Sequence, residues 1–173
     1  MRTLILGGAR SGKSALAERL AHESGHEVVY IATGQAHDEE MAARIAHHRA
    51  SRPDHWHSVE EPLALAAALR AHARPGRCVL VDCLTLWLSN LLGAEDEGRL
   101  VEERAALLDV LPSLTGQVLL VSNEVGLGVV PLGELTRRFV DEAGRLHQAL
   151  AAQCDRVLFV AAGLPLALKG KLA

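Results

Sequence analysis

The sequence predicts an α/β fold in which a mostly parallel central sheet is covered by helices on both faces. Short apolar runs rich in β-branched residues alternate along the chain with longer segments of helical periodicity. The first apolar run, residues 4–6, is followed at once by the glycine-rich pattern G-x-x-x-x-G-K-[ST] at residues 7–14 and then by a helical pattern. Strands that alternate with helices form parallel sheets, because each crossover places a helix on a face of the sheet.

The glycine-rich segment predicts a phosphate-binding loop and, with it, a P-loop NTPase-type three-layer fold. Glycines let backbone N–H groups approach phosphate oxygens closely, and the N-terminus of the following helix attracts the same anion. In this pattern Lys13 reaches the β and γ phosphates, and Ser14 holds Mg²⁺. A glycine-rich turn without a ligand is disfavoured by the strand before it and the helix after it. The loop residues are Gly7, Gly8, Ala9, Arg10, Ser11, Gly12, Lys13 and Ser14.

The first half of the chain predicts one further strand, three helices and a segment that is a loop or a short edge strand. The expected elements are a helix at 14–21, a strand at 27–33, a helix at 38–50, a loop or short edge strand at 54–61, and a helix at 62–73. Met41, Ile45 and His48 share one stripe of the 38–50 helix. This helix ends at Arg52-Pro53, because the residue before a proline is pushed out of the α region. Pro62 is expected to open the next helix.

The second half continues the alternation. The expected elements are a strand at 78–82, a short helix at 84–92, an exposed acidic link at 94–98, a helix at 100–111, a strand at 117–121, a glycine-rich loop at 122–128, a helix at 133–152 and a final strand at 155–161. Pro112 stops one helix, since proline cannot continue it. The long helix is expected to turn Leu135, Phe139, Leu146 and Leu150 toward the core. We predict a single domain over residues 1–173.

Polar residues end several of the predicted strands, and Asp82 is the most informative of them. In parallel sheets the carboxyl ends of the strands meet at one edge, where ligands bind. A carboxylate that ends an apolar strand needs solvent, a partner or a cation. Beside Ser14 and a triphosphate, Asp82 would hold Mg²⁺. The alternative is an N-cap for the helix at 84–92, a role compatible with metal binding. Thr33 and Asn123-Glu124 end two other strands.

The histidines are concentrated in one part of the chain. Five of the nine lie between residues 37 and 57: His37, His47, His48, His55 and His57. A zinc site is disfavoured, since no cysteine joins them and no catalytic zinc spacing is present. Most, including His22, His26 and His72, are expected on the surface. The pair His47-His48 differs, because nearby arginines create an anion-binding environment in which a histidine can act as a base or nucleophile.

Composition excludes several classes of function. The net charge of −3 and the aromatic content of 3% argue against a nucleic-acid partner. The longest apolar run, residues 157–168, is too short to span a membrane, and no signal peptide is expected. Cys78, Cys83 and Cys154 have neither metal-ligand nor disulfide spacing, so each is expected to be a small buried residue. We therefore expect a cytoplasmic protein.

In these motifs the chain resembles a known family, the bifunctional adenosylcobinamide kinase / adenosylcobinamide-phosphate guanylyltransferases of cobalamin biosynthesis. The phosphate loop is shared with many unrelated enzymes, whereas the segments M-A-A-R-I-x-H-H and N-E-V-G-x-G-x-V-P are far more specific. The matching segments are residues 7–14, 30–33, 38–49, 52–53 and 122–131. The resemblance extends from residue 4 to about residue 164.

The resemblance implies two reactions. A nucleoside triphosphate, GTP or ATP, phosphorylates the aminopropanol hydroxyl of adenosylcobinamide. GTP then transfers GMP to the new phosphate through a covalent guanylyl-histidine, which matches His48 here, and pyrophosphate is released. The resemblance also implies a homotrimer and, besides the phosphate loop, nucleotide contacts at Ala32, Thr33, Gly34, Arg49, Ala50, Ser51, Arg52, Glu60 and Asp82. Some relatives carry Glu at the Asp82 position, and either carboxylate can serve Mg²⁺.

Two other functions stay open from the residues alone. A plain small-molecule kinase would use Lys13, Ser14 and Asp82 but not His48. A GTP-binding switch is disfavoured because no Asn-Lys-x-Asp motif follows the fourth strand, where Ser122-Asn123-Glu124-Val125 stands instead. Because no motif in the sequence predicts recognition of the guanine base, the expectation that the protein uses GTP rests on the resemblance. Glu124 is a candidate general base for the kinase step only because it lies at the end of a predicted strand.

Overall fold

The computed structural model describes residues 1–36, 39–50, 53–94 and 96–172. The described side chains exclude those of Met41, Arg44, residues 47–50 and Glu97. In chain order the elements are β1 (Arg2–Gly7), α1 (Lys13–Glu23), β2 (Glu27–Ala32), α2 (Glu39–Ala50), β3 (His57–Glu60), α3 (Leu65–His72), β4 (Arg77–Asp82), α4 (Leu84–Leu92), α5 (Glu97–Val110), a 3₁₀ turn η1 (Leu111–Ser113), β5 (Gln117–Asn123), α6 (Glu134–Gln153), β6 (Arg156–Ala161) and β7 (Leu164–Lys169).

The strands form one seven-stranded sheet in the order β3-β2-β4-β5-β1-β6-β7. All neighbours are parallel except β6 and β7, which form an antiparallel pair at one edge. β1 therefore lies inside the sheet between β5 and β6, and β5 separates it from β4. The carboxyl ends of β1, β2, β4 and β5 share one edge, as predicted.

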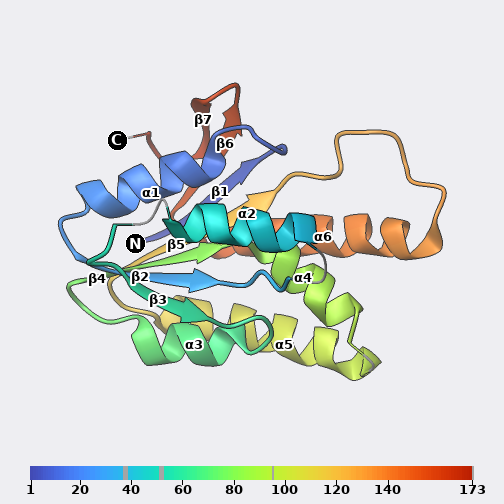
Figure 1. Ribbon diagram of the computed structural model, residues 1–173, viewed down its shortest axis with the longest axis horizontal. Coiled ribbons are helices and arrows are strands. Elements are labelled where there is room, and N and C mark those ends of the chain that lie inside the picture. The colour runs from blue at the N-terminus through green and yellow to red at the C-terminus, as the bar shows by residue number, and fades with distance from the viewer. Residues whose placement is uncertain (37–38, 51–52, 95, 173) are drawn as a thin grey trace.

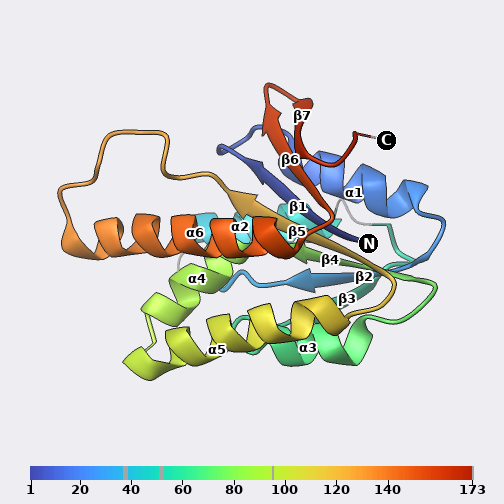
Figure 2. The ribbon, with the colours of Figure 1, turned by 180° about the vertical axis from the view of Figure 1, so that it is seen from behind.

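Helices cover both faces of the sheet, which gives the predicted three layers. α1 and α2 lie in front of the sheet in Figure 1, whereas α5 and α6 lie in front of it in the reverse view of Figure 2. Two separate apolar clusters fill the two interfaces. One joins the sheet to α3, α4, α5 and α6, and the other packs α1 and Trp56 on the opposite face. Because side chains alternate along a strand, the five inner strands, β2, β4, β5, β1 and β6, contribute to both clusters.

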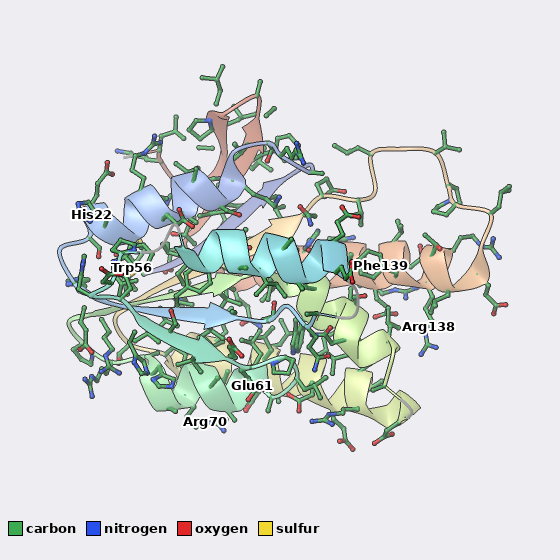
Figure 3. The ribbon with its side chains drawn as sticks, in the orientation of Figure 1. His22, Trp56, Glu61, Arg70, Arg138 and Phe139 are labelled. Atoms are coloured by element: carbon green, nitrogen blue, oxygen red, sulfur yellow. The ribbon has the colours of Figure 1, made fainter. Side chains whose placement is uncertain are left out.

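Several predicted boundaries are corrected by the structure. The strand that was predicted to be the last one is followed by another strand, β7, which the sequence pattern does not predict. Most residues of β7 are exposed, so no pattern of buried residues marks it as a strand. α3 begins at Leu65 rather than at Pro62, because the Glu61 carboxylate accepts the N–H groups of Leu63 and Ala64 and holds a turn there. Figure 3 shows Glu61 at this position between β3 and α3. α5 begins at Glu97, where the Asp96 side chain caps it.

The end of β5 and the start of α6 also differ from the prediction. β5 runs to Asn123, so Ser122 and Asn123 belong to the strand and not to the loop. Leu135 was expected in the core, but its side chain is 62% exposed. The first turns of α6 extend past the rest of the molecule with the loop before them (Figures 1 and 2), so Leu135 has no core to enter. Leu146 and Leu150 are buried and Phe139 is partly buried, as predicted.

No helix in the described part of the chain is long and apolar enough to cross a membrane. Cys78, Cys83 and Cys154 are free thiols and all three are buried, as the sequence predicted. Burial raises the pKa of the Cys78 and Cys154 thiols to about 11, which keeps both protonated near neutral pH.

Candidate nucleotide-binding site

The phosphate loop connects the last residue of β1, Gly7, to the first residue of α1, Lys13. Its backbone turns at the Ser11 N–H, which donates to the Gly8 carbonyl at 3.2 Å. Gly12 has a φ of +94°, a conformation that residues with a Cβ rarely adopt. The loop is also tied to the turn between β6 and β7, because the Gly163 N–H donates to the Ser11 carbonyl at 2.8 Å. The conformation of the phosphate loop is therefore stabilised by a contact with a segment about 150 residues away in the sequence.

Gly7 is needed because its neighbours leave no space for a side chain. A Cβ built on it would lie 2.5 Å from the Ser11 hydroxyl oxygen and 2.6 Å from the Val160 carbonyl oxygen. Gly8 differs, since a Cβ there would meet nothing within 4 Å. The buried Ser11 hydroxyl has no hydrogen-bond partner within the described residues. A buried polar atom without a partner is rare in proteins, and a bound phosphate would supply one here.

Lys13 supplies the positive charge of the loop. Its side chain is buried, and its Nζ donates to the Gly8 carbonyl at 3.2 Å. Within the described part of the chain no carboxylate forms an ion pair with this ammonium group. Lys13 and the half-buried Ser14 also open α1, whose N-cap, Gly12, makes no side-chain capping bond. The positive end of the helix and an unpaired ammonium group therefore meet at the glycine loop, an arrangement that favours a bound anion.

Asp82 ends β4, at the edge of the sheet that carries the phosphate loop. Its carboxylate accepts the Tyr30 hydroxyl at 3.1 Å. The predicted N-cap role is wrong, because Cys83 is the N-cap of α4 and no side chain caps the helix. Burial raises the pKa of the Cys83 thiol; the Asp82 charge adds to this, while the Lys13 charge opposes it.

The predicted contacts near β2 fall at the same edge of the sheet. Ala32 pairs with Glu60 of β3 on one side and with Asp82 of β4 on the other. Thr33 is fully buried, and Gly34 lies against Leu86 and the Ile45 side chain of α2. The structure therefore brings together the end of β2, Glu60 and Asp82, whereas the phosphate loop follows β1, which β5 separates from β4. Near them, Gln35, Leu63, Ser89, Asn90, Gly93 and Ala94 line a cavity of about 220 Å³.

The predicted nucleophile lies on α2, whose described backbone includes positions 47 and 48. The side chains of His47, His48, Arg49 and Ala50 lie outside the description, as do residues Ser51 and Arg52 altogether. The roles of these residues therefore stay predictions. Within the described residues no group of three metal-ligating side chains forms.

His22, His26 and His72 lie away from the phosphate loop, and His37 lies outside the described residues. His22 and His26 are exposed, and Figure 3 shows His22 on the outer side of α1. His72 is half-buried, with its ring centroid 5.7 Å from that of His57. Burial lowers the pKa of His72, and the His57 charge acts in the same direction. These positions support surface or structural roles.

Asn123 and Glu124 lie at the end of β5, the strand next to β1, whose own end leads into the phosphate loop. Asn123 pairs with Gly7, and its side-chain amide donates to the Thr85 hydroxyl at 3.2 Å. The Glu124 backbone N–H donates to the Gly7 carbonyl at 3.0 Å. The Glu124 carboxylate instead turns to its own loop, where it accepts the Gly126 N–H at 2.7 Å. Glu124 therefore supports the loop after β5 as well as the strand end.

His147, which is not among the residues predicted for the site, is buried on α6. Its Nε2 lies 2.7 Å from the Ser122 hydroxyl and its Nδ1 lies 3.7 Å from a Glu124 carboxylate oxygen. Burial lowers the pKa of His147, although the Glu124 charge opposes the shift. The spacing of His147 from Ala143 and Leu150 could have indicated its inward position, since residues three and four apart share a helix face.

Comparison with known proteins places the chain among close relatives. The family model described as cobinamide kinase / cobinamide phosphate guanyltransferase matches residues 3–168. The bifunctional adenosylcobalamin biosynthesis protein CobP of Pseudomonas aeruginosa is 68% identical over 171 residues, which are 99% of each chain. The bifunctional adenosylcobalamin biosynthesis protein CobU of Escherichia coli is 42% identical over 182 residues, covering 98% of this chain and all of that protein.

Solved structures with little sequence similarity share the fold. The RadB recombinase superposes with a TM-score of 0.51 at 19% identity, over 91% of this chain and 73% of the recombinase. A Pyrococcus horikoshii protein superposes with a TM-score of 0.55 at 9% identity, over 98% of this chain and 86% of that protein. These likenesses confirm the predicted P-loop NTPase-type α/β fold.

Proposed function

Because the chain belongs to the cobinamide kinase / cobinamide phosphate guanyltransferase family, we propose that it catalyses both reactions within one domain, residues 1–173. In the first reaction, the aminopropanol hydroxyl of adenosylcobinamide attacks the γ-phosphorus of a nucleoside triphosphate, loses its proton and releases the diphosphate. In the second, GTP gives GMP to the new phosphate and releases pyrophosphate. The substrates are a corrinoid and a nucleoside triphosphate, GTP or ATP in the kinase step, so we expect a cytoplasmic enzyme.

The observation that carries the proposal is the buried ammonium group of Lys13 beside the glycine loop, which forms no ion pair with a carboxylate among the described residues. In both reactions negative charge develops on the departing phosphate oxygens. Lys13 and the N–H groups at the start of α1 would stabilise this charge, because they are already oriented before the reaction. One phosphate site therefore serves both reactions, which differ in the phosphorus atom attacked. The remaining proposed nucleotide contacts are Ala32, Thr33, Gly34, Arg49, Ala50, Ser51, Arg52 and Glu60.

The residues at the site also fit Mg²⁺. Ser14 and Asp82 offer hard oxygen ligands, and within the described residues no cationic side chain pairs with Asp82. An unpaired carboxylate next to a triphosphate site suits a divalent cation. Bound Mg²⁺ would neutralise charge on the triphosphate. In our proposal Ser14 and Asp82 hold the ion, and Lys13 binds the phosphates.

We assign the guanylyl transfer to His48. A histidine imidazole is largely neutral near pH 7 and can attack the α-phosphorus of GTP, forming a nitrogen–phosphorus bond as pyrophosphate leaves. The phosphate of the corrinoid then attacks the same phosphorus and releases the histidine. On a helix, neighbouring residues point about 100° apart, so His47 and His48 cannot both face the triphosphate. His48 shares the stripe of Ile45, whose side chain packs toward Gly34.

The exposed apolar loop before α6 supports a homo-oligomer. Five apolar side chains are exposed there, with Val129 and Leu132 at 96% and 97%. The others are Leu127, Val130 and, in the first turn of α6, Leu135. Such a patch on one segment marks an interaction site, and a neighbouring copy of the chain is the occupant we propose. The resemblance implies a trimer, which would also enlarge the surface that binds the corrinoid.

Incubation with GTP labelled at the α or γ position, without corrinoid, tests the proposal. Label from the α position should stay on the wild-type protein, survive alkali and be lost in acid, as expected for a phosphoramidate. His48→Ala should lose this label but keep γ-phosphoryl transfer to adenosylcobinamide, whereas the neighbouring control His47→Ala should keep both. A wild-type protein that retains no α-label would be a plain kinase. An acid-labile adduct on His48→Ala would move the nucleophile to another residue.

A further inference from the structure

Two hydroxyl groups of the β2 segment reach the end of β4, where Asp82 and Cys83 lie. They belong to Tyr30, the single tyrosine of the chain, and to Thr33. Both residues are fully buried, and their hydroxyls act across about fifty residues of sequence. Buried hydroxyls in a core keep their hydrogen bonds because losing them is costly. Tyr30 and Thr33 thus hold two neighbouring residues, Asp82 and Cys83.

Tyr30 orients the Asp82 carboxylate. Its ring packs in the apolar cluster on the α1 face, and its hydroxyl donates to Asp82 Oδ2 at 3.1 Å. Tyr30 pairs with Leu80 in the sheet, and Asp82 lies two residues further along β4, on the same face as Leu80. A neutral phenol donates one hydrogen bond, which leaves Oδ1 of the carboxylate available to another partner.

Thr33 fixes the backbone next to Asp82. Its hydroxyl donates to the Cys83 carbonyl at 2.7 Å and accepts the Cys83 N–H at 3.0 Å. The Thr33 N–H also points to the Asp82 carbonyl at 3.4 Å. Asn90 of α4 holds Thr33 in turn, since its amide donates to the Thr33 carbonyl at 2.7 Å and to the Pro62 carbonyl at 3.0 Å. The position of Asp82 is thus set from β2 and α4 together.

We propose that Tyr30 and Thr33 are positioning residues for the divalent cation of the nucleotide site, acting through Asp82. The inference rests on the proposed function, because it requires Asp82 to meet a metal–triphosphate complex. Residues that orient metal ligands commonly affect metal affinity by about 10- to 100-fold. A carboxylate held by a neutral hydroxyl keeps its full negative charge, whereas a paired arginine or lysine would cancel it. Tyr30 therefore orients Asp82 without competing with the cation.

The test measures metal binding directly. Mn²⁺, a paramagnetic stand-in for Mg²⁺, is titrated into protein with saturating GTP and followed by electron paramagnetic resonance. GTP binding without metal is measured separately by calorimetry. Tyr30→Phe, which removes only the hydroxyl, should weaken Mn²⁺ binding about tenfold or more and leave metal-free GTP binding unchanged. Thr33→Val should also weaken Mn²⁺ binding, and Thr33→Ser, which keeps the hydroxyl, should restore it.

A matched control separates this role from a general loss of a buried hydroxyl. Thr3 is also fully buried, and its hydroxyl accepts the Arg156 Nε–H at the other end of β1, so Thr3→Val should bind Mn²⁺ normally. The inference fails if Tyr30→Phe binds Mn²⁺ like the wild type while Asp82→Asn does not. It also fails if Tyr30→Phe weakens metal-free GTP binding equally, or if Thr3→Val shows the same defect. A wild-type protein without GTP-dependent Mn²⁺ binding would instead overturn the proposed cation site itself.

Discussion

The Ser122 hydroxyl lies 2.7 Å from Nε2 of His147, which joins the end of β5 to the middle of α6 inside the protein. The other ring nitrogen of His147 lies 3.7 Å from the Glu124 carboxylate. Because Glu124 also donates its N–H to Gly7, this contact connects α6 with the strand that carries the phosphate loop. A buried neutral imidazole can satisfy both neighbours, as hydrogen-bond acceptor toward one and donor toward the other.

We predict that this histidine makes stability depend on pH. Burial lowers the folded-state pKa of His147, so protonation favours the unfolded state. The contribution of His147 is complete above its unfolded pKa of about 6.5 and is lost as the pH falls below it. The urea midpoint of the wild type should therefore fall between pH 7 and pH 5. His147→Gln should flatten this fall, whereas His22→Gln on the surface should not. Equal slopes for His147→Gln and the wild type would contradict the prediction.

Lys13→Ala should impair both reactions by about 100-fold or more, because each develops charge on the same phosphates. The rates of γ-phosphoryl transfer and of guanylyl transfer are measured separately. Lys169→Ala is the control, since Lys169 also donates to backbone carbonyls, at Ala151 and Ala152, but lies on β7. Normal turnover of the Lys13 variant in either reaction would show that the two reactions do not share the site.

Gly7→Ala should destabilise the free protein by about 1–3 kcal/mol, the usual cost of forcing atoms into a filled space. The new methyl group would meet the Ser11 hydroxyl and the Val160 carbonyl. Gly8→Ala, one residue further, places its methyl group in open space and should change stability by less than about 0.5 kcal/mol. Urea unfolding without nucleotide compares the two. A Gly7 variant as stable as the Gly8 variant would mean that the loop relaxes freely.

The apolar loop should control the oligomeric state. We expect sedimentation to give a trimer for the wild type and smaller species for the double variant Val129→Asp, Leu132→Asp, since buried charges would oppose assembly. Val101→Asp is the control, because Val101 is an exposed apolar residue on α5, away from the loop. A strictly monomeric wild-type protein with full activity would argue against a shared corrinoid surface.

The local pattern of the sequence determined the order of the elements and the phosphate loop. Residues 4–14 predict a strand, a glycine loop and a helix, because hydrophobic periodicity and glycine spacing are set by neighbours in the chain. The position of Asp82 at the end of an apolar strand could be predicted for the same reason. β7 could not, because most of its residues, including Leu164, Leu166 and Leu168, are exposed and no buried pattern marks it.

Only the tertiary structure decided which residues meet at the site. Tyr30 reaches Asp82 because β2 pairs with β4 in one particular register, and a shift by one residue would turn either side chain to the other face. His147 becomes a core residue because α6 packs over the end of β5, whereas Leu135 on the same helix stays exposed where α6 leaves the body of the protein. Helical periodicity specifies a face of a helix, but the extent of the partner surface decides how far along the helix that face is buried.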